Sequence, residues 1–221
     1  MTDPFDKLLK KDIFGEVSLR HSVDGPRIFR DARPARPWAR WLARSLLKRE
    51  ARALAATGGI AGIPEILQVE TDILQRSWIA GGPMHKCRPT DIRYFRAAAK
   101  ILRRLHRAGV AHNDLAKEPN WLVREDGGPG IVDFQMACYC PRRGSLFRQL
   151  AREDLRHLLK HKRTYCAEHL TRRELAILAK PTVISKTWML TGKPVYLFVT
   201  RKILGWADRE GANDRSVPTE E

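Results

Sequence analysis

Three polar side chains near the middle of the chain have the types and the spacing needed to transfer a phosphoryl group. Asp114 ends a His-Asn-Asp run, Asn120 follows six residues later, and Asp133 comes after a short apolar stretch. A carboxylate such as that of Asp114 can orient or deprotonate a hydroxyl group. The oxygens of Asn120 and Asp133 are hard ligands of the kind that Mg²⁺ prefers, and the ion would neutralise charge on the transferred group.

A β-hairpin is predicted to bring the two metal ligands together. Residues 121–123 and 130–132 are apolar, and the stretch 124–129 between them contains the turn formers Gly, Asp and Pro. Asn120 would enter the first strand and Asp133 would leave the second, so the two residues should lie side by side. Three unrelated polar residues in loops are the alternative, and the ordered spacing argues against it.

The same stretch resembles the protein-kinase-like superfamily. The catalytic loop of that family follows the pattern H-R-D-x-x-x-x-N, and its metal loop reads D-F-G. Here residues 112–120 read His-Asn-Asp-Leu-Ala-Lys-Glu-Pro-Asn, and residues 133–135 read Asp-Phe-Gln. Asn120 therefore falls one position late, and Gln135 replaces a glycine whose backbone freedom helps that loop move. Both departures indicate an atypical kinase.

The resemblance implies roles for individual residues and an overall architecture. Asp114 would be the catalytic base, Asn120 and Asp133 would bind Mg²⁺, and Lys117 would neutralise the γ-phosphate of ATP. The implied fold is α+β and two-lobed, with a small β-rich N-lobe that contains one αC-like helix and a mainly helical C-lobe. We expect one domain with the following parts: N-lobe 1–76, hinge 77–84, C-lobe 85–211 and polar tail 212–221.

The N-terminal part has two strand-like runs, 12–19 and 27–30, around the turn 24–26. They suit the first strands of a small nucleotide-covering lobe. The phosphate-covering loop would then lie around Gly15, although only one glycine stands where the kinase pattern has three.

A helix is predicted over residues 34–56, and Glu50 lies within its apolar stripe, so its carboxylate should point inward and find a cation. In kinases a strand lysine pairs with a glutamate of helix αC. Arg30 and Glu50 occupy the corresponding positions, and Arg30 could also contact the α- and β-phosphates of ATP. The alternatives are a surface arginine and an ordinary helix-surface pair of Glu50 with Arg49 or Arg52.

The segment 74–84 resembles the kinase hinge, in which extended backbone binds adenine. Ser77 and Ile79 would contribute main-chain groups to ATP, although the Gly-Gly-Pro at 81–83 could equally form a plain turn. A helix should follow, with Thr90 as its N-cap and Gly109 at its end.

A second long helix is predicted to begin near Ser145, and Asp154 lies within its apolar stripe. In kinases a helix aspartate accepts N–H groups from the catalytic loop, so Asp154 could brace that loop; exposure at the edge of the stripe is the slightly favoured alternative. The basic cluster 157–163 is interpreted as a solvated face, or as an anchor for a phosphate-bearing or membrane-bound substrate.

The formal charge of +16 and the pI near 10.2 predict attraction to polyanions, namely nucleic acid, anionic lipid headgroups or a phosphorylated substrate. No nucleic-acid motif accompanies this charge, so specific nucleic-acid binding is not expected. The N-terminus lacks the layout of a signal peptide, and no apolar run is long enough for a membrane span. We therefore expect a cytoplasmic protein that could contact the inner face of an anionic membrane.

The four cysteines lack the spacing of a zinc site or of a secreted disulfide framework and are interpreted as reduced thiols. A zinc site is the alternative. Its ligands would be Cys138, Cys140, Cys166 and His169.

Only about nine residues separate Gln135 from the helix that begins near Ser145, so an activation segment for peptide docking cannot fit. The chain is similar to the lipopolysaccharide-core (Kdo and heptose) kinases of bacteria and to RIO-type serine kinases. It is expected to transfer the γ-phosphoryl group of ATP to a hydroxyl acceptor, either a lipopolysaccharide-core sugar or a protein serine or threonine. An inactive pseudokinase or a basic binding module is the alternative.

Overall fold

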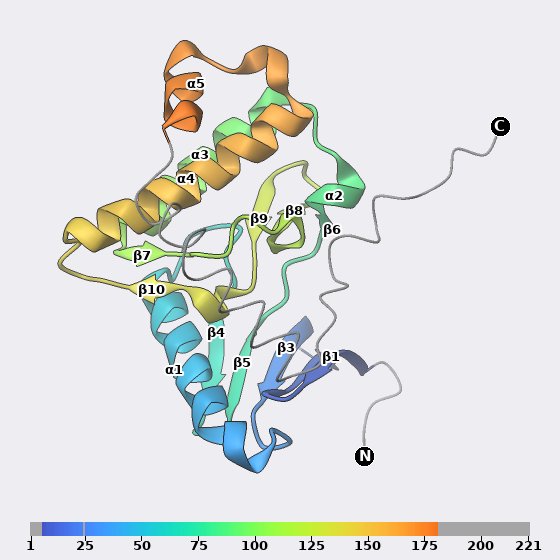
Figure 1. Ribbon diagram of the computed structural model, residues 1–221. Helices are drawn as coiled ribbons and strands as arrows, with labels where there is room; N and C mark the ends of the chain where they lie inside the picture. Colours follow the sequence, from blue (N-terminus) through green and yellow to red (C-terminus); the bar gives the residue numbers. More distant parts are fainter. Residues whose placement is uncertain (1–5, 24, 181–221) are drawn as a thin grey trace, which may run out of the picture. The chain divides into compact units, whose positions relative to one another are not determined.

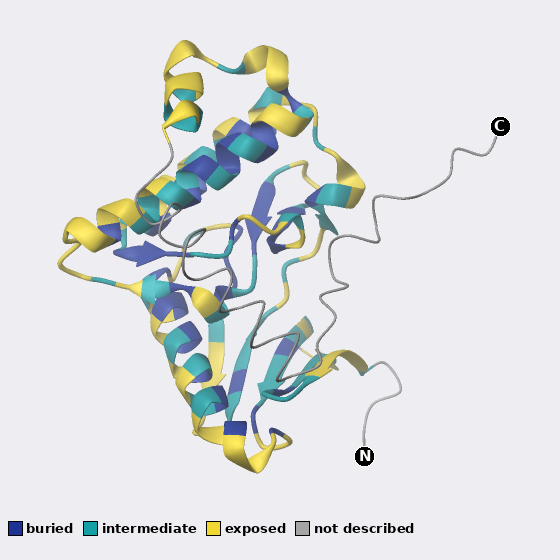
Figure 2. Ribbon diagram, in the orientation of Figure 1, coloured by how far each residue is buried: buried dark blue, intermediate teal, exposed yellow. Residues whose placement is uncertain are grey.

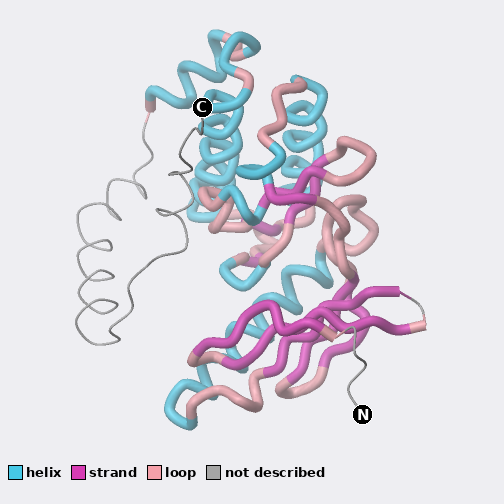
Figure 3. The backbone as a smooth tube through the Cα atoms, turned by 90° about the vertical axis from the view of Figure 1, so that its right-hand side faces the viewer, coloured by secondary structure: helices cyan, strands magenta, loops and turns pink. Residues whose placement is uncertain are grey.

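The computed structural model describes residues 6–23 and 25–180. A β-rich N-terminal region is followed by a mainly helical region, so the fold class is α+β (Figure 1). The first sheet has five antiparallel strands in the order β1-β2-β3-β5-β4, and Figure 3 shows the strands gathered together. These strands are β1 (Lys7–Asp12), β2 (Gly15–Ser22), β3 (Gly25–Asp31), β4 (Ile66–Val69) and β5 (Ile73–Ser77).

The prediction of one strand over residues 12–19 was wrong at its start, where a turn separates β1 from β2. The Asp12 carboxylate accepts the N–H of Phe14 at 2.8 Å, and Gly15 follows with a φ of 124°. A Cβ atom at position 15 would collide with the carbonyl oxygen of Asp31, so only glycine fits. The turn places Phe14 and Gly15 at the tip of a hairpin.

The predicted helix of the N-terminal region is confirmed as the 3₁₀ turn η1 (Pro37–Ala39) followed by α1 (Arg40–Ala56). Its apolar stripe packs against the sheet and forms a small core. The buried members of this core are Ala32, Ala35, Ala43, Leu47, Ala51 and Leu74.

The helical region is built on α3 (Ile92–Arg107) and α4 (Ser145–Tyr165), which pack together through their buried stripes (Figure 2). The short α2 (Met84–Cys87) precedes them, and η4 (Ala167–His169) and α5 (Arg172–Ala179) follow. The N-cap of α3 is Asp91 and not Thr90, because the Asp91 carboxylate accepts the N–H of Arg93 at 2.7 Å.

Short strands connect the two long helices. β8 (Trp121–Val123) pairs with β9 (Pro129–Ile131), which confirms the predicted hairpin with its second strand one residue earlier. β6 (Gly82–Pro83) extends this sheet, and β7 (Val110–Ala111) pairs with β10 (Cys138–Tyr139). The 3₁₀ turns η2 (Glu118–Asn120) and η3 (Phe134–Met136) lie immediately before β8 and shortly after β9.

The predicted N-terminal segment up to residue 5, the part of the C-lobe over 181–211 and the polar tail over 212–221 lie outside the described residues. Within the part that is described, no helix combines the length and the apolar character needed to cross a membrane.

Candidate functional site

The residues predicted for the catalytic loop do lie together. The side-chain nitrogen of Asn120 donates to the main-chain oxygen of Asp114 at 2.9 Å and to its carboxylate at 3.1 Å. The ammonium group of Lys117 lies 3.1 Å from the same carboxylate. The Asp114 side chain keeps 18% of its surface exposed, so it remains accessible to an incoming group.

The hairpin brings Asp133 next to Asn120 through the backbone, as predicted. The N–H of Val132 donates to the carbonyl oxygen of Asn120 at 3.0 Å, directly before Asp133. Asp133 has a φ of 62°, a left-handed conformation that aspartate tolerates better than most residues. This conformation turns the chain from the hairpin into η3.

Asp154 braces the loop that contains Asp114. It is fully buried, and its carboxylate accepts the N–H groups of His112 at 2.7 Å and Asn113 at 2.9 Å, with the His106 ring at 3.2 Å. The slightly favoured prediction of an exposed Asp154 was therefore wrong. Buried N–H groups need acceptors, and a carboxylate on α4 satisfies two of them at once.

The His112 ring joins the same loop to the strand that precedes Asp133. Its Nε2 lies 3.0 Å from the carbonyl oxygen of Val132, and its ring packs edge-on against Phe134 at 4.7 Å. Because a carbonyl only accepts, Nε2 carries the proton. His112 therefore holds the loop in place.

The second half of the site is an ion-pair cluster around Glu50, which is only 2% exposed. A guanidinium nitrogen of Arg30 lies 2.6 Å from one carboxylate oxygen, and the Nε atom of Arg76 lies 3.2 Å from the other. The predicted pair of Arg30 with Glu50 is thus present. The alternative partner Arg49 instead donates to the carbonyl oxygens of Ala137 at 2.7 Å and Met136 at 2.8 Å.

Sequence reasoning missed Arg76 and the contact of Arg49. Arg76 lies two residues after the buried Leu74 on β5, so period-two alternation places it on the inward face with Leu74. That signal was present in the sequence but was obscured because residues 74–84 were interpreted as resembling the kinase hinge. The Arg49 contact spans 88 residues, and no local pattern indicates it.

A cavity of about 160 Å³ is lined by the Glu50 cluster and by Asp133, whereas Asp114, Lys117 and Asn120 do not line it. The hairpin tip, represented by Phe14 and Gly15, lines it together with Arg30, Glu50 and Asp133. The Asp133 carboxylate and the guanidinium groups of Arg30 and Arg76 thus line one small space, together with the carboxylates of Asp12, Glu16 and Glu50. Such a space can hold a cation and an anion at the same time.

Ser77 and Ile79 do not line this cavity. The N–H of Ser77 donates to the carbonyl oxygen of Glu65 at 2.8 Å, and its hydroxyl accepts the N–H of Glu65 at 2.9 Å. Ser77 therefore closes the end of β5, and a main-chain contact of Ser77 or Ile79 with ATP stays a prediction.

In the basic cluster of α4, His161 and Lys162 are buried and His157 and Lys160 are half-buried, so the predicted solvated face is confirmed only for Arg163. Burial lowers the pKa of His161, whose Nε2 lies 2.8 Å from the carbonyl oxygen of Leu115. Lys162 is 6% exposed and pairs with Glu174 at 2.9 Å. Burial also lowers the pKa of His157 to about 4. Of these side chains, His161 supports the loop after Asp114 through its contact with Leu115.

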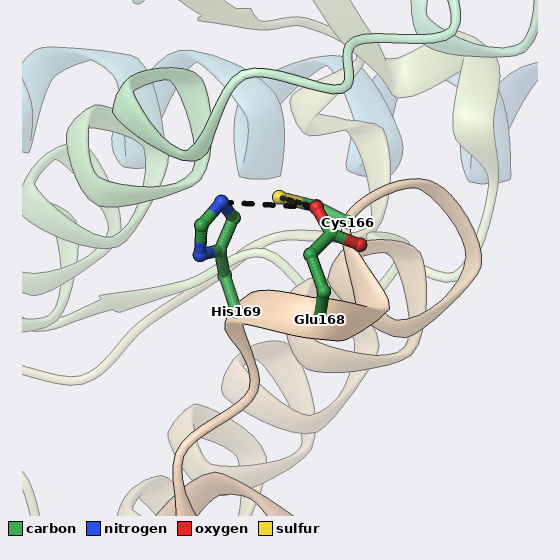
Figure 4. Close-up of side chains that lie close together, drawn as sticks. All are labelled: Cys166, Glu168 and His169. Carbon is green, nitrogen blue, oxygen red and sulfur yellow. Dashed lines mark hydrogen bonds and ion pairs between the residues drawn. The ribbon is translucent and has the colours of Figure 1, made fainter.

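The predicted zinc alternative is not assembled as a four-ligand set. Cys166, Glu168 and His169 place their donor atoms within 4.8 Å of one another (Figure 4), whereas Cys138 and Cys140 are not part of this group. The thiol of Cys166 donates to Glu168 at 3.6 Å, and burial raises the pKa of that thiol, which favours the protonated form. This hydrogen bond accounts for the close approach of the Cys166 and Glu168 side chains.

Neither the protein-family models nor the curated proteins include a match to this chain. Inference about the activity therefore rests on the geometry of the site.

Proposed function

We propose that this chain is an ATP- and Mg²⁺-dependent phosphotransferase with the two-lobed protein-kinase-like fold. The observation that supports this most strongly is the contact of Asn120 with Asp114 beside the hairpin that leads to Asp133. The order of elements supports the fold: a sheet, a helix whose Glu50 pairs with Arg30, an extended connection, a helix, the loop and the hairpin.

The donor set at the loop fits magnesium. Because the nitrogen of the Asn120 amide donates to Asp114, its oxygen remains as an acceptor, and Asp133 adds a carboxylate from the cavity wall. Mg²⁺ bound by these two residues would neutralise the charge that develops on the transferred phosphoryl group.

Asp114 would orient the acceptor hydroxyl and take its proton. The braced main chain at 112–113 fixes the direction of this carboxylate, and the Lys117 ammonium lies beside it. A fixed base within hydrogen-bond reach accelerates such a step by about 10²–10⁴-fold.

The Glu50 cluster would bind the phosphates of ATP. Two guanidinium groups face a single carboxylate there, so the cluster has one positive charge in excess. Guanidinium groups recognise phosphate oxygens through parallel N–H donors, so arginine can serve where kinases place lysine. The hairpin tip at Gly15 would cover these phosphates.

The acceptor would be a hydroxyl of a lipopolysaccharide-core sugar or of a protein serine or threonine. Between Asp133 and the start of α4 at Ser145 the chain forms only η3 and the short β10. A docking platform for extended peptides has no room in that interval, which favours an acceptor of another shape.

The test compares three carboxylate variants in an assay for ADP release with Mg²⁺. Asp114→Asn should reduce turnover by about 10²–10⁴-fold. Asp133→Asn should also remove the Mg²⁺-dependent part of the thermal shift that ATP produces. Asp126→Asn is the control, because Asp126 is 61% exposed in the turn between β8 and β9. Equal turnover in all variants would end the proposal.

A binding module that holds nucleotide without turnover is the second candidate. It is favoured by the late position of Asn120 and by Gln135 in place of the loop glycine. Under this alternative, ATP would stabilise the wild-type chain in the thermal shift, yet no ADP would be released.

A further inference from the structure

The turn η1 and the start of α1 expose two large aromatic side chains. Trp38 is 56% exposed and Trp41 is 70% exposed, although tryptophan is usually buried for most of its surface. The three-residue spacing places both indole rings on one side of the chain where η1 passes into α1. Neither ring belongs to the two cores of the described residues.

The same face continues with basic side chains. Lys48 and Arg52 are exposed, and helical spacing puts them in line with Trp41. Among the residues that the structure describes, no carboxylate forms an ion pair with either of them. Arg44 differs, because it pairs with Asp72 at 2.6 Å.

Acidic residues are almost absent from this part of the chain. Residues 33–56 contain seven basic residues and one acidic residue, Glu50. Glu50 points inward and is neutralised by Arg30 and Arg76, so no acidic side chain of α1 faces outward. A face of this kind attracts a surface of dense negative charge.

We propose that Trp38, Trp41, Lys48 and Arg52 dock the protein on an anionic lipid bilayer. Indole rings favour the headgroup region of a membrane, and lysine and arginine beside them bind anionic headgroups. The face of a helix is convex and can rest on the flat surface of a bilayer. Single-stranded nucleic acid is instead bound in grooves that follow its backbone, and none of these four residues lines the cavity beside Glu50 or the one between α3, α4 and α5.

Docking is a property of this face and does not depend on phosphoryl transfer. The inner side of α1 holds Glu50 and Arg49, which contact the cavity and the segment after Asp133. A docked α1 would therefore hold the candidate site at a set distance from the membrane.

The test measures co-sedimentation of the full chain with vesicles of phosphatidylcholine, with and without phosphatidylglycerol. Wild-type protein should sediment only with the anionic vesicles. The double variant Trp38→Ser/Trp41→Ser should bind roughly tenfold more weakly, since two aromatic groups no longer insert. Loss of Lys48 and Arg52 by substitution with glutamate should weaken binding by about fivefold or more for each residue.

Matched controls use exposed residues elsewhere. Arg103→Glu/Arg107→Glu on α3 repeats the four-residue spacing and the charge change, and Leu146→Ser removes another exposed apolar side chain. These variants should bind as the wild type does. Circular dichroism should give the same helix content for all variants, because every substituted side chain is exposed.

A second measurement locates the tryptophans directly. Lipids brominated near the headgroup should quench part of the fluorescence of the bound wild-type chain, and the Trp38/Trp41 double variant should lose this quenching. Equal binding by the α1 variants and the α3 controls would overturn the proposal. The proposal would also be overturned if the protein bound single-stranded DNA through these residues and did not co-sediment with anionic vesicles.

Discussion

Two buried carboxylates, one in each half of the candidate site, are satisfied in different ways. Asp154 is fully buried and accepts two main-chain N–H groups of the loop before Asp114. Glu50 is 2% exposed and lies between the side chains of Arg30 and Arg76. Asp154 therefore fixes the backbone of the loop, whereas Glu50 holds two positively charged side chains beside it.

The difference indicates a division of tasks. A carboxylate bound by main-chain N–H groups sets the position of the chain to within a hydrogen-bond length, which suits a loop that must direct Asp114. Each arginine has five N–H donors, so Arg30 and Arg76 can stay on Glu50 and still offer donors to a phosphate group. We therefore expect the Asp154 half to be rigid and the Glu50 half to respond to ligand.

The largest effect is expected from Asp154→Ala. It leaves the N–H groups of His112 and Asn113 buried without an acceptor, and should lower the free energy of unfolding by about 3–5 kcal/mol. Asp154→Asn keeps one acceptor and should cost about 1–3 kcal/mol. Urea unfolding measures both, with the exposed Asp126→Ala as the control. Equal stability of the alanine variant and the control would contradict the brace.

A smaller effect is expected from Glu50→Gln, about 2–3 kcal/mol. The cost is below that of a fully buried pair because Arg30 and Arg76 keep 11% and 13% of their side chains exposed. A double-mutant cycle with Arg30→Met should give a coupling energy of about 1–2 kcal/mol. Additive effects would show that Arg76 alone neutralises Glu50, and would remove Arg30 from this half of the site.

The two carboxylates also differ in how far the sequence could predict them. The inward direction of Glu50 follows from leucine and alanine at three and four residues on either side, which is a local pattern. Asp154 lies in a similar stripe, but its burial depends on main-chain partners 41 and 42 residues away. Local periodicity cannot supply partners at that separation, so exposure was the slightly favoured prediction.

In other parts of the chain, too, local sequence patterns predicted local structure but not contacts between distant residues. The hairpin between Asn120 and Asp133 was predictable because its turn residues and apolar runs are contiguous. The basic cluster of α4 was misjudged because Lys162 meets Glu174 of α5 and His161 meets the carbonyl oxygen of Leu115, both across tertiary contacts. Charge in a sequence indicates a solvated face only when no partner approaches from another element.

The third prediction has the smallest expected effect. It concerns the pH dependence of stability, which should differ between the two halves of the site. Burial, with a contribution from Lys160, lowers the pKa of His157 on α4 from 6.5 to about 4. The unfolded chain therefore takes up a proton below pH 6.5 that the folded chain accepts only near pH 4. Protonation favours unfolding in this interval, so stability is lost as the pH falls from 6.5 towards 4.

His157→Gln should remove this part of the pH dependence. At about 1.4 kcal/mol per pKa unit, the wild type should lose about 1–2 kcal/mol more than the variant between pH 7 and pH 5. Urea unfolding at the two pH values measures the difference, and His21→Gln on the exposed part of β2 is the control. Because the Glu50 half is neutralised by arginine, which stays charged throughout, its coupling energy with Arg30 should be the same at both pH values. A coupling that changed as much as the His157 contribution would mean that the two halves titrate together, and the proposed division between a rigid and a responsive half would fail.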